Sequence, residues 1–574
     1  MKANYKLCLL FLLLIASSCD KILDRPPKDQ ITDKDMTFTQ NEMRLYANQF
    51  YPNFPDFFSV FWGDLSSDNM ISGNYNYNAQ ISGTITVPST GGGWDWGNVR
   101  AVNYFLANYH VTKEPLNSVQ TYIGEMYFWR AWFYFGLMKQ FGALPWYNEP
   151  LTTNSEELYA PRLPRNVIAD SILSDLDKAI DMLAPLGQAE AMRINKDVAL
   201  AFKSRVALYE GTWEKYHAGT DFGVAGADYQ KYFKQAVDAA EQVIQSGHYT
   251  IQPVGTDPRW SYWRLFNQRD LSANKEVIMW RKYDASLSLT NMGSRYLSQE
   301  GSNTGISRQL VDAYLCQDGK PISVSTQYQG DDSLSEVVSH RDPRLAQTIF
   351  VRGYPRHVNG GDTTGRFSEP DINLPGQTKN TSGYQLFKGL DPDVSQQGDG
   401  GGSTAAISFR YAEVLLNEAE AKAELGECTQ AVLDKTINQL RDRVNMPHLS
   451  VNVGFTDPAW EFPSLSPLMN EIRRERRVEL ACEGFRFDDL MRWAAADVIK
   501  KPLLGAKYSQ FEGKSFDPPL ENIPVSNDGY IFPYKNTPAA NGWQFDVRKN
   551  YLKPLPSNEL TINTKLDQNP GYQP

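Results

Sequence analysis

The chain has 574 residues, which is long enough to bury a large core, and its 67 acidic and 57 basic side chains give a formal charge of −10. An acidic balance of this size argues against nucleic acid and anionic lipid surfaces as partners. After residue 18 the densest apolar run is 126–138, which is too short to span a membrane and suits a buried helix.

Residues 1–18 have the pattern of a secretory signal. Two lysines supply positive charge, residues 7–16 are apolar, and small side chains follow. Cys19 comes directly after the small residues, as in a bacterial lipoprotein signal, where the cysteine thiol carries the lipid. The sequence therefore predicts a signal peptide over 1–18 and a lipidated, polar tether over 19–39 that holds the chain at a membrane surface. An ordinary secretory signal with a chance cysteine is the alternative.

Amphipathic helices dominate from about residue 40, because apolar residues recur every three to four positions. The predicted helices cover residues 122–141, 165–183, 195–215, 232–246, 410–425 and 429–444. Alanines stand where two helices would come close, as in helix pairs of the tetratricopeptide type. The predicted fold class is mostly α, with tetratricopeptide-like helix pairs in an α-α superhelix, long irregular loops and a few short strands.

Aromatic residues are unusually frequent, at 12% of the chain, and many lie in polar, glycine-rich loops. Long loops in a helical protein usually carry function. Aromatic rings stack on the apolar faces of sugars, and acidic or amide groups bind the hydroxyls. The candidate ligand-binding residues of this kind are Asp68, Asn69, Tyr75, Tyr77, Trp94, Asp95, Trp96 and Asn98. We expect one of the two tryptophans to anchor its loop to the core.

Motifs for catalysis or metal binding are not recognisable. The six histidines lack HExxH spacing, and neither GxSxG nor a P-loop occurs. Cys316, Cys428 and Cys482 are widely spaced, without CxxC, and are predicted to be small buried side chains. The chain is therefore predicted not to be an enzyme and to bind no cofactor and no metal.

The arginine-rich stretch 471–477 is predicted to form ion pairs within the fold and not a phosphate site. Glutamates lie three and four residues from the arginines, which makes pairs such as Glu471–Arg474 and Arg476–Glu479 possible on one helix.

Four blocks, in this order, resemble the SusD/RagB family of Bacteroidetes outer-membrane lipoproteins. They are SSCDKILDRPP (17–27), YIGEMYFWRAWFYFGLMKQFGALPW (122–146), FRYAEVLLNEAEAKAELG (409–426) and EIRRERRVELACEGFRFDDLMRW (471–493). A family-like C-terminal stretch, LKPLPSNELTINTKLDQNPGY, follows them, so the resemblance covers essentially the whole chain. It implies an N-terminal SusD-like region over 40–270 and a C-terminal RagB/SusD region over 271–574.

The resemblance implies a surface lipoprotein of the outer membrane that captures a glycan without covalent chemistry. Such a protein passes its ligand to a SusC-like TonB-dependent barrel, over which it acts as a lid. Further ligand contacts are expected from the central segments, at Trp280, Tyr283 and Tyr384. An oligopeptide ligand, as in a RagAB-like uptake system, is the alternative, and a surface glycoside hydrolase is the remote one.

The lipid anchor makes the first testable prediction. Cys19→Ala removes the only thiol near the cleavage point, so the mature protein should leave the membrane fraction. Fractionation of cells that lack the barrel partner measures this. A variant that still sediments with outer membranes would contradict the anchor.

Overall fold

We describe the fold from a computed structural model of the chain. The structure describes residues 37–251, 257–299, 301–372, 374, 376–514, 516, 519, 520 and 522–573. Cys19, the predicted signal peptide and most of the predicted tether lie outside the described residues.

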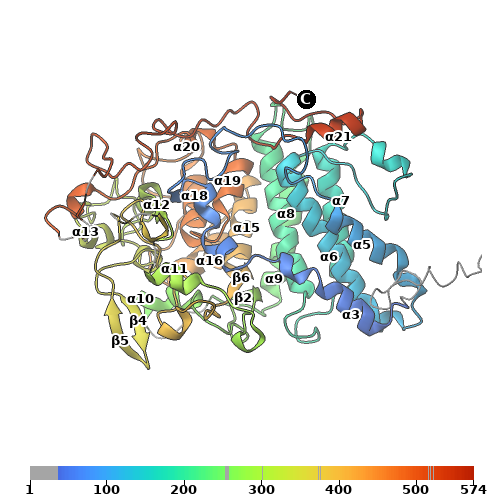
Figure 1. The fold of residues 1–574 in the computed structure, drawn as a ribbon, viewed down its shortest axis with the longest axis horizontal. Coiled ribbons are helices and arrows are strands. Elements are labelled where there is room, and N and C mark those ends of the chain that lie inside the picture. Colours follow the sequence, from blue (N-terminus) through green and yellow to red (C-terminus); the bar gives the residue numbers. More distant parts are fainter. Residues whose placement is uncertain are drawn as a thin grey trace, which may run out of the picture.

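Long helices pack side by side in one half of the molecule (Figure 1). They are α3 (Gln40–Asn48), α5 (Gly97–Asn108), α6 (Leu116–Phe141), α7 (Arg165–Met182), α8 (Lys196–Tyr216) and α9 (Tyr229–Gln245). The five-residue helix α4 (Phe57–Phe61) belongs instead to the other half, where Phe57 and Phe61 are buried. Helix α6 packs on α5 and α7, and α8 packs on α7 and α9. Gly211 allows the closest of these approaches, because a Cβ atom there would lie 2.8 Å from the ring of Phe233 on α9. The predicted mostly helical fold is confirmed.

The other half consists of short helices and strands joined by long segments. Its helices are α10 (Pro258–Ser261), α11 (Gly293–Gln299), α12 (Arg308–Ala313), α13 (Leu334–Val338), α14 (Leu345–Thr348), α15 (Tyr411–Glu424), α16 (Gln430–Lys435), α17 (Ile437–Asp442), α18 (Pro467–Glu479), α19 (Arg486–Arg492) and α20 (Ala496–Ile499). Helix α21 (Ser557–Ile562), near the C-terminus, lies on the side of the long helices (Figure 1). Its strands, with β1 from the N-terminal part, are β1 (Met70–Ser72), β2 (Val277–Arg281), β3 (Thr304–Ile306), β4 (Pro355–Asn359), β5 (Asp362–Arg366) and β6 (Ala406–Arg410). Within the described residues they pair antiparallel as β1–β3, β2–β6 and β4–β5.

One predicted helix is wrong. The segment 429–444 forms two short helices, α16 and α17, that are separated at Thr436. The backbone of Thr436 leaves the helical region, with φ −120° and ψ −94°, and its hydroxyl donates to the carbonyl of Val432 at 2.6 Å. Threonine hydroxyls that bond back to the preceding turn bend or interrupt helices. The periodicity of apolar residues does not predict such an interruption.

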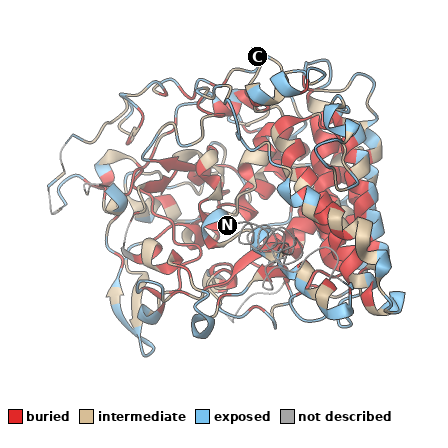
Figure 2. Ribbon diagram, turned by 45° about the vertical axis from the view of Figure 1, so that its right-hand side comes forward, coloured by how far each residue is buried: buried red, intermediate tan, exposed pale blue. Residues whose placement is uncertain are grey.

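Two apolar cores hold the halves together. The first extends through α5 to α9 and into α15, and the second lies beneath α4, β1, β2 and the segments around α14. Buried positions line the inward faces of the long helices in Figure 2. In the part of the chain that the structure describes, no helix is both long and apolar enough to cross a membrane.

Helix α18 lies at the centre of a buried network of ion pairs. Glu479, fully buried, accepts hydrogen bonds from Arg344 (2.9 Å), Arg410 (2.7 Å) and Arg443 (2.6 Å). These three arginines lower the pKa of Glu479 far below its usual range, in spite of burial. Within the arginine-rich stretch, the predicted pair Glu471–Arg474 is confirmed at 3.0 Å. The predicted pair Arg476–Glu479 is wrong, because Arg476 instead bonds to Asp489 of α19 at 2.9 Å.

We expect Glu479→Gln to lower the free energy of unfolding by about 3–5 kcal/mol, because it leaves buried arginine charge without its partner. Urea unfolding followed by circular dichroism measures the loss. Glu157→Gln is the matched control, because Glu157 is exposed and its loss should cost less than about 0.5 kcal/mol. Equal effects of the two changes would contradict the structural role of the network.

Candidate functional site

Two adjoining pockets form a groove in which aromatic and polar side chains meet. The aromatic pocket, of about 440 Å³, is lined by Phe58, Trp62, Tyr77, Tyr296, Ser302, Thr304 and Gln377 among others. The polar pocket, of about 640 Å³, is lined by Tyr77, Asn78, Gln80, Lys139, Gln140, Asp488 and Lys553 among others. Tyr77 and Ser66 line both pockets, so the two pockets adjoin at these residues. We name the combined feature the groove.

Helix α4 presents the aromatic pocket with a stacked pair of rings. Asp56 caps the helix by accepting from the amide of Ser59 at 2.7 Å. The side chains of Phe57 and Phe61 point into the core, so Phe58 and Trp62, four residues apart, share another face. Their rings stack with centroids 5.1 Å apart, and Phe58 remains 37% exposed.

Tyr296 joins this pair from a distant part of the sequence. Its ring meets the ring of Phe58 edge-on at a centroid distance of 5.6 Å. Helix α11 reaches this position because it begins at Gly293, where a Cβ atom would lie 2.0 Å from the ring of Phe57. Glycine at this position thus permits the contact that brings Tyr296 to the pocket.

The loop that carries Tyr77 is held by its own hydrogen bonds and by a neighbouring turn. The amide of Gly73 donates to the carbonyl of Asn303 at 2.7 Å, and the amide of Tyr77 donates to the carbonyl of Asn74 at 3.0 Å. The side chain of Asn76 accepts from the hydroxyl of Ser82 at 2.5 Å. Tyr77 is 55% exposed on this fixed loop. Its ring is therefore available to a ligand with little ordering of the backbone.

The polar pocket combines charged and amide groups from three regions. Lys139 of α6 and Asp488 of α19 form an ion pair at 2.5 Å. Lys553, from the C-terminal segment, donates to the side-chain oxygen of Gln140 at 2.8 Å. None of the residues that line the aromatic pocket is charged. The groove therefore offers apolar ring faces at one end and hydrogen-bonding groups at the other.

Asp68 and Asn69, predicted to contact a ligand, are instead occupied within the fold. Asp68 is buried and bonded to Arg477 at 2.8 Å and to Arg486 at 2.7 Å, and these arginines lower its pKa to about 2. Asn69 accepts from Arg477 at 2.8 Å and donates to Asp64 at 2.8 Å. These bonds anchor the segment that precedes the loop of Tyr77 to the rest of the fold.

Trp94 and Trp96 line a separate cavity of about 400 Å³, together with Tyr147, Tyr159 and residues of α21. The ring of Trp94 meets Phe141 edge-on at 5.0 Å, and the ring of Trp96 meets Tyr147 at 5.0 Å. Both tryptophans therefore pack on neighbouring rings, where only one was expected to do so. Asp95 and Asn98, their predicted companions, are exposed.

The remaining predicted residues divide between half-buried and buried positions. Tyr75 is half-buried, and its carbonyl accepts from the indole of Trp543 at 3.1 Å. Trp280, Tyr283 and Tyr384, the expected central contacts, lie inside the second core, at most 7% exposed. The hydroxyl of Tyr283 accepts from the amide of Phe57 at 3.0 Å. These three rings support the elements around the groove and do not line either of its pockets.

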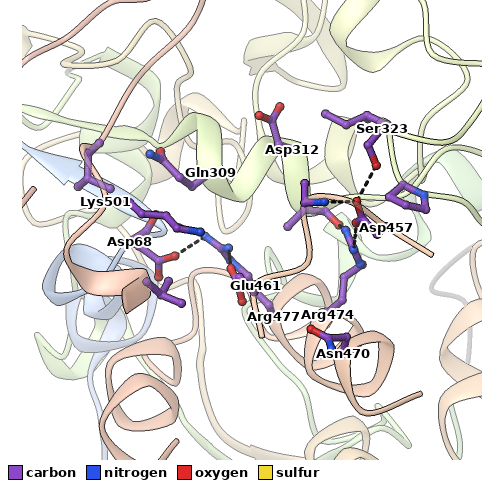
Figure 3. Close-up of a pocket in the computed structure, with 16 residues that line it drawn as sticks. Asp68, Gln309, Asp312, Ser323, Asp457, Glu461, Asn470, Arg474, Arg477 and Lys501 are labelled. Atoms are coloured by element: carbon purple, nitrogen blue, oxygen red, sulfur yellow. Dashed lines mark hydrogen bonds and ion pairs between the residues drawn. The ribbon is translucent and has the colours of Figure 1, made fainter. Parts of the chain in front are cut away.

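A third cavity, of about 240 Å³, is lined mainly by polar and charged residues (Figure 3). The polar side chains of this cavity largely form hydrogen bonds and ion pairs with one another. Arg474 bonds to Asp457 at 2.5 Å, Ser323 bonds to the same carboxylate at 2.6 Å, and Arg477 bonds to Asp68. Among the described residues, no group of three or more His, Cys, Asp or Glu could hold a metal ion.

Of the four rings that line the aromatic pocket, Tyr77 is predicted from the sequence, and Phe58, Trp62 and Tyr296 are not. A signal exists for the first two, because FFSVFW at 57–62 has more aromatic rings than a five-residue helix can bury on one face. For Tyr296 the sequence carries no such signal, because a close contact of two distant helices places it.

Comparisons with known proteins agree with the fold. A model of the SusD family matches residues 267–572, and a model described as starch-binding associating with outer membrane matches residues 25–208. The first match alone covers more than half of the chain, so the chain belongs to the SusD family.

Individual relatives are distant but cover nearly the whole chain. SusD-like protein P38 of Formosa agariphila is 24% identical over 526 residues, which are 88% of this chain and 95% of that protein. A SusD-like carbohydrate binding protein from Bacteroides fragilis has a similar fold, with a TM-score of 0.72 and 22% identity, covering 93% of this chain and 100% of that one. A laminarin binding SusD-like protein has a TM-score of 0.59 and 19% identity, and the match covers 93% of this chain and 99% of that one.

The buried position of Asp68 yields a prediction. Asp68→Asn leaves Arg477 and Arg486 with less compensation, so the free energy of unfolding should fall by about 3 kcal/mol. Urea unfolding measures this. Asp95→Asn, an exposed aspartate from the same predicted set, should change stability by less than about 0.5 kcal/mol. If the two variants are equally stable, the ion pairs of Asp68 do not support the fold.

Proposed function

We propose that the chain captures an oligosaccharide in the groove, as a lipoprotein of the cell surface, and delivers it to a SusC-like TonB-dependent barrel. The observation that carries the proposal is the row of accessible rings, Phe58, Tyr296 and Tyr77, which continues directly into a pocket of amide and charged groups. No covalent step is part of this function.

The chemistry of the groove matches that of a sugar chain. A pyranose ring has apolar C–H faces that stack on aromatic rings, and equatorial hydroxyls that need donors and acceptors. The aromatic pocket supplies the rings, and Gln80, Gln140 and Asn78 line the polar pocket with amide groups. The two pockets together are large enough for a ligand of several sugar units.

Membrane attachment and transfer to a barrel draw their support from the sequence and from the family. The Cys19 signal would place the lipid, and the N-terminal family model is described as associating with the outer membrane. Two of the similar structures are named as carbohydrate or laminarin binding, which supports a glycan as the ligand class.

The ring of Tyr77 gives the direct test. Loss of one stacking ring should cost about 1–3 kcal/mol, by analogy with base stacking on aromatic side chains, or roughly tenfold to over a hundredfold in affinity. We expect Tyr77→Ala and Phe58→Ala each to weaken binding of the best oligosaccharide from a panel by this factor, with little change in melting temperature. Calorimetric titration measures the affinity.

Tyr159→Ala is the matched control, because Tyr159 is 45% exposed but lines the cavity of Trp94 and Trp96. It should leave affinity unchanged within about twofold. If Tyr159→Ala, Trp94→Ala or Trp96→Ala weakens binding while Tyr77→Ala does not, the ligand binds in that second cavity. If only oligopeptides in the panel bind, the glycan proposal is wrong and the peptide alternative holds.

A further inference from the structure

The groove carries an unbalanced positive charge. Among its lining residues only Lys139, Asp488 and Lys553 are charged, and all three belong to the polar pocket. Lys139 and Asp488 neutralise each other in their ion pair at 2.5 Å. The ammonium group of Lys553 therefore remains as the net charge of the groove.

Lys553 is held firmly in place. Its amide donates to the carbonyl of Gln140 at 2.7 Å, and its carbonyl accepts from the side chain of Asn569 at 2.7 Å. Its Nζ donates to the side-chain oxygen of Gln140 at 2.8 Å and forms no ion pair with any described carboxylate. An ammonium has three N–H donors, so two remain for a ligand. Partial burial lowers the pKa of Lys553, since no anion offsets the desolvation.

Several buried cations in the described part of the chain have compensating partners. Arg130 bonds to Asp175 at 2.6 Å, and Lys388 bonds to Glu483 at 2.7 Å. Arg341, which lacks a carboxylate partner, donates to several backbone carbonyls, including that of Val311 at 2.7 Å. The ammonium group of Lys553 instead bonds to the neutral side-chain amide of Gln140. Because a half-buried ammonium is stabilised by an opposite charge, an anion supplied by the ligand would complete the bonding of Lys553.

We propose that the groove selects acidic glycans, with a sugar carboxylate or sulfate ester bound to the Nζ of Lys553 while a neighbouring sugar ring stacks on Tyr77. The proposal rests on glycan capture in the groove, since both residues line the same polar pocket. The overall charge of −10 does not prevent this, because charges farther away than about 8 Å are largely screened at physiological salt.

Pairs of ligands that differ only in the anion test the selection. One pair is a galacturonic acid oligosaccharide and its carboxyl-reduced form, and the other is a sulfated galactan oligosaccharide and its desulfated form. We expect at least one acidic member to bind about tenfold to a hundredfold more tightly than its neutral counterpart, as for a hydrogen bond to a charged group. Which pair shows the difference distinguishes carboxylate from sulfate.

Variants assign the difference to Lys553. Lys553→Gln should abolish the preference for the acidic member, and Lys553→Arg should retain most of it. Lys234→Gln removes the same charge from an exposed position on α9 and should have no effect. Melting temperatures check that each variant is folded, and the preference of the wild type should fall as salt rises.

The outcomes separate the two proposals. If neutral oligosaccharides bind best and Tyr77→Ala weakens them while Lys553→Gln does not, acid selection is wrong and glycan capture stands. If an acidic glycan binds but Lys553→Gln leaves the preference intact, Lys553 is not the anion site. If neither these ligands nor a wider panel of neutral glycans binds, both proposals fail.

Discussion

The half of the structure that consists of short helices and strands depends on the buried carboxylate of Glu479. Three arginines that are far apart in the sequence, Arg344, Arg410 and Arg443, converge on it. Arg410 ends β6 and precedes α15, and Arg443 follows α17, so one side chain of α18 links β6, α15 and α17. Buried ion pairs are weak sources of net stability, but they are strongly directional, and breaking one is costly. In a region built of short elements, this directionality sets the arrangement.

The same helix determines where the groove lies. Helix α18 ends at Glu479, and the turn that leads from it to α19 holds the segment from α4 to β1. The amide of Cys482 donates to Asp64 at 2.8 Å, and a Cβ atom on Gly63 would lie 2.6 Å from the Cα of Gly484. Asp68 completes the attachment through its two arginines. The rings of Phe58 and Trp62 and the loop of Tyr77 are therefore positioned by polar contacts with α18 and α19, although they contribute few of those contacts themselves.

This dependence explains what the sequence could predict. Helices such as α7 and α8 bury a continuous apolar stripe, and their bounds follow from the periodicity to within one residue. Helix α6 begins six residues before its predicted start. The division at Thr436 is not predicted, because a back-bonded hydroxyl acts through a single hydrogen bond.

The candidate site was harder to predict because residue type alone does not say which polar or aromatic side chains face outward. Asp68 and Tyr77 lie nine residues apart, on either side of β1, yet the first is buried against arginines and the second is exposed. Nothing in the neighbouring sequence distinguishes the buried residue from the exposed one. The partners of Asp68, Arg477 and Arg486, are about 400 residues away.

The groove itself is assembled from distant regions of the chain, among them the loop of Tyr77, helix α11 and the C-terminal segment around Lys553. Each of these three regions has contacts that do not involve the groove side chains, namely hydrogen bonds of the loop, the approach at Gly293 and the bond from the amide of Lys553 to the carbonyl of Gln140. A ring or a charge that faces the groove contributes little to these contacts. Such a residue is therefore open to replacement without loss of the frame, as exposed side chains generally are. A fold built in this way separates what holds the site from what the site recognises, so relatives that share the frame at 24% identity or less are free to differ in ligand.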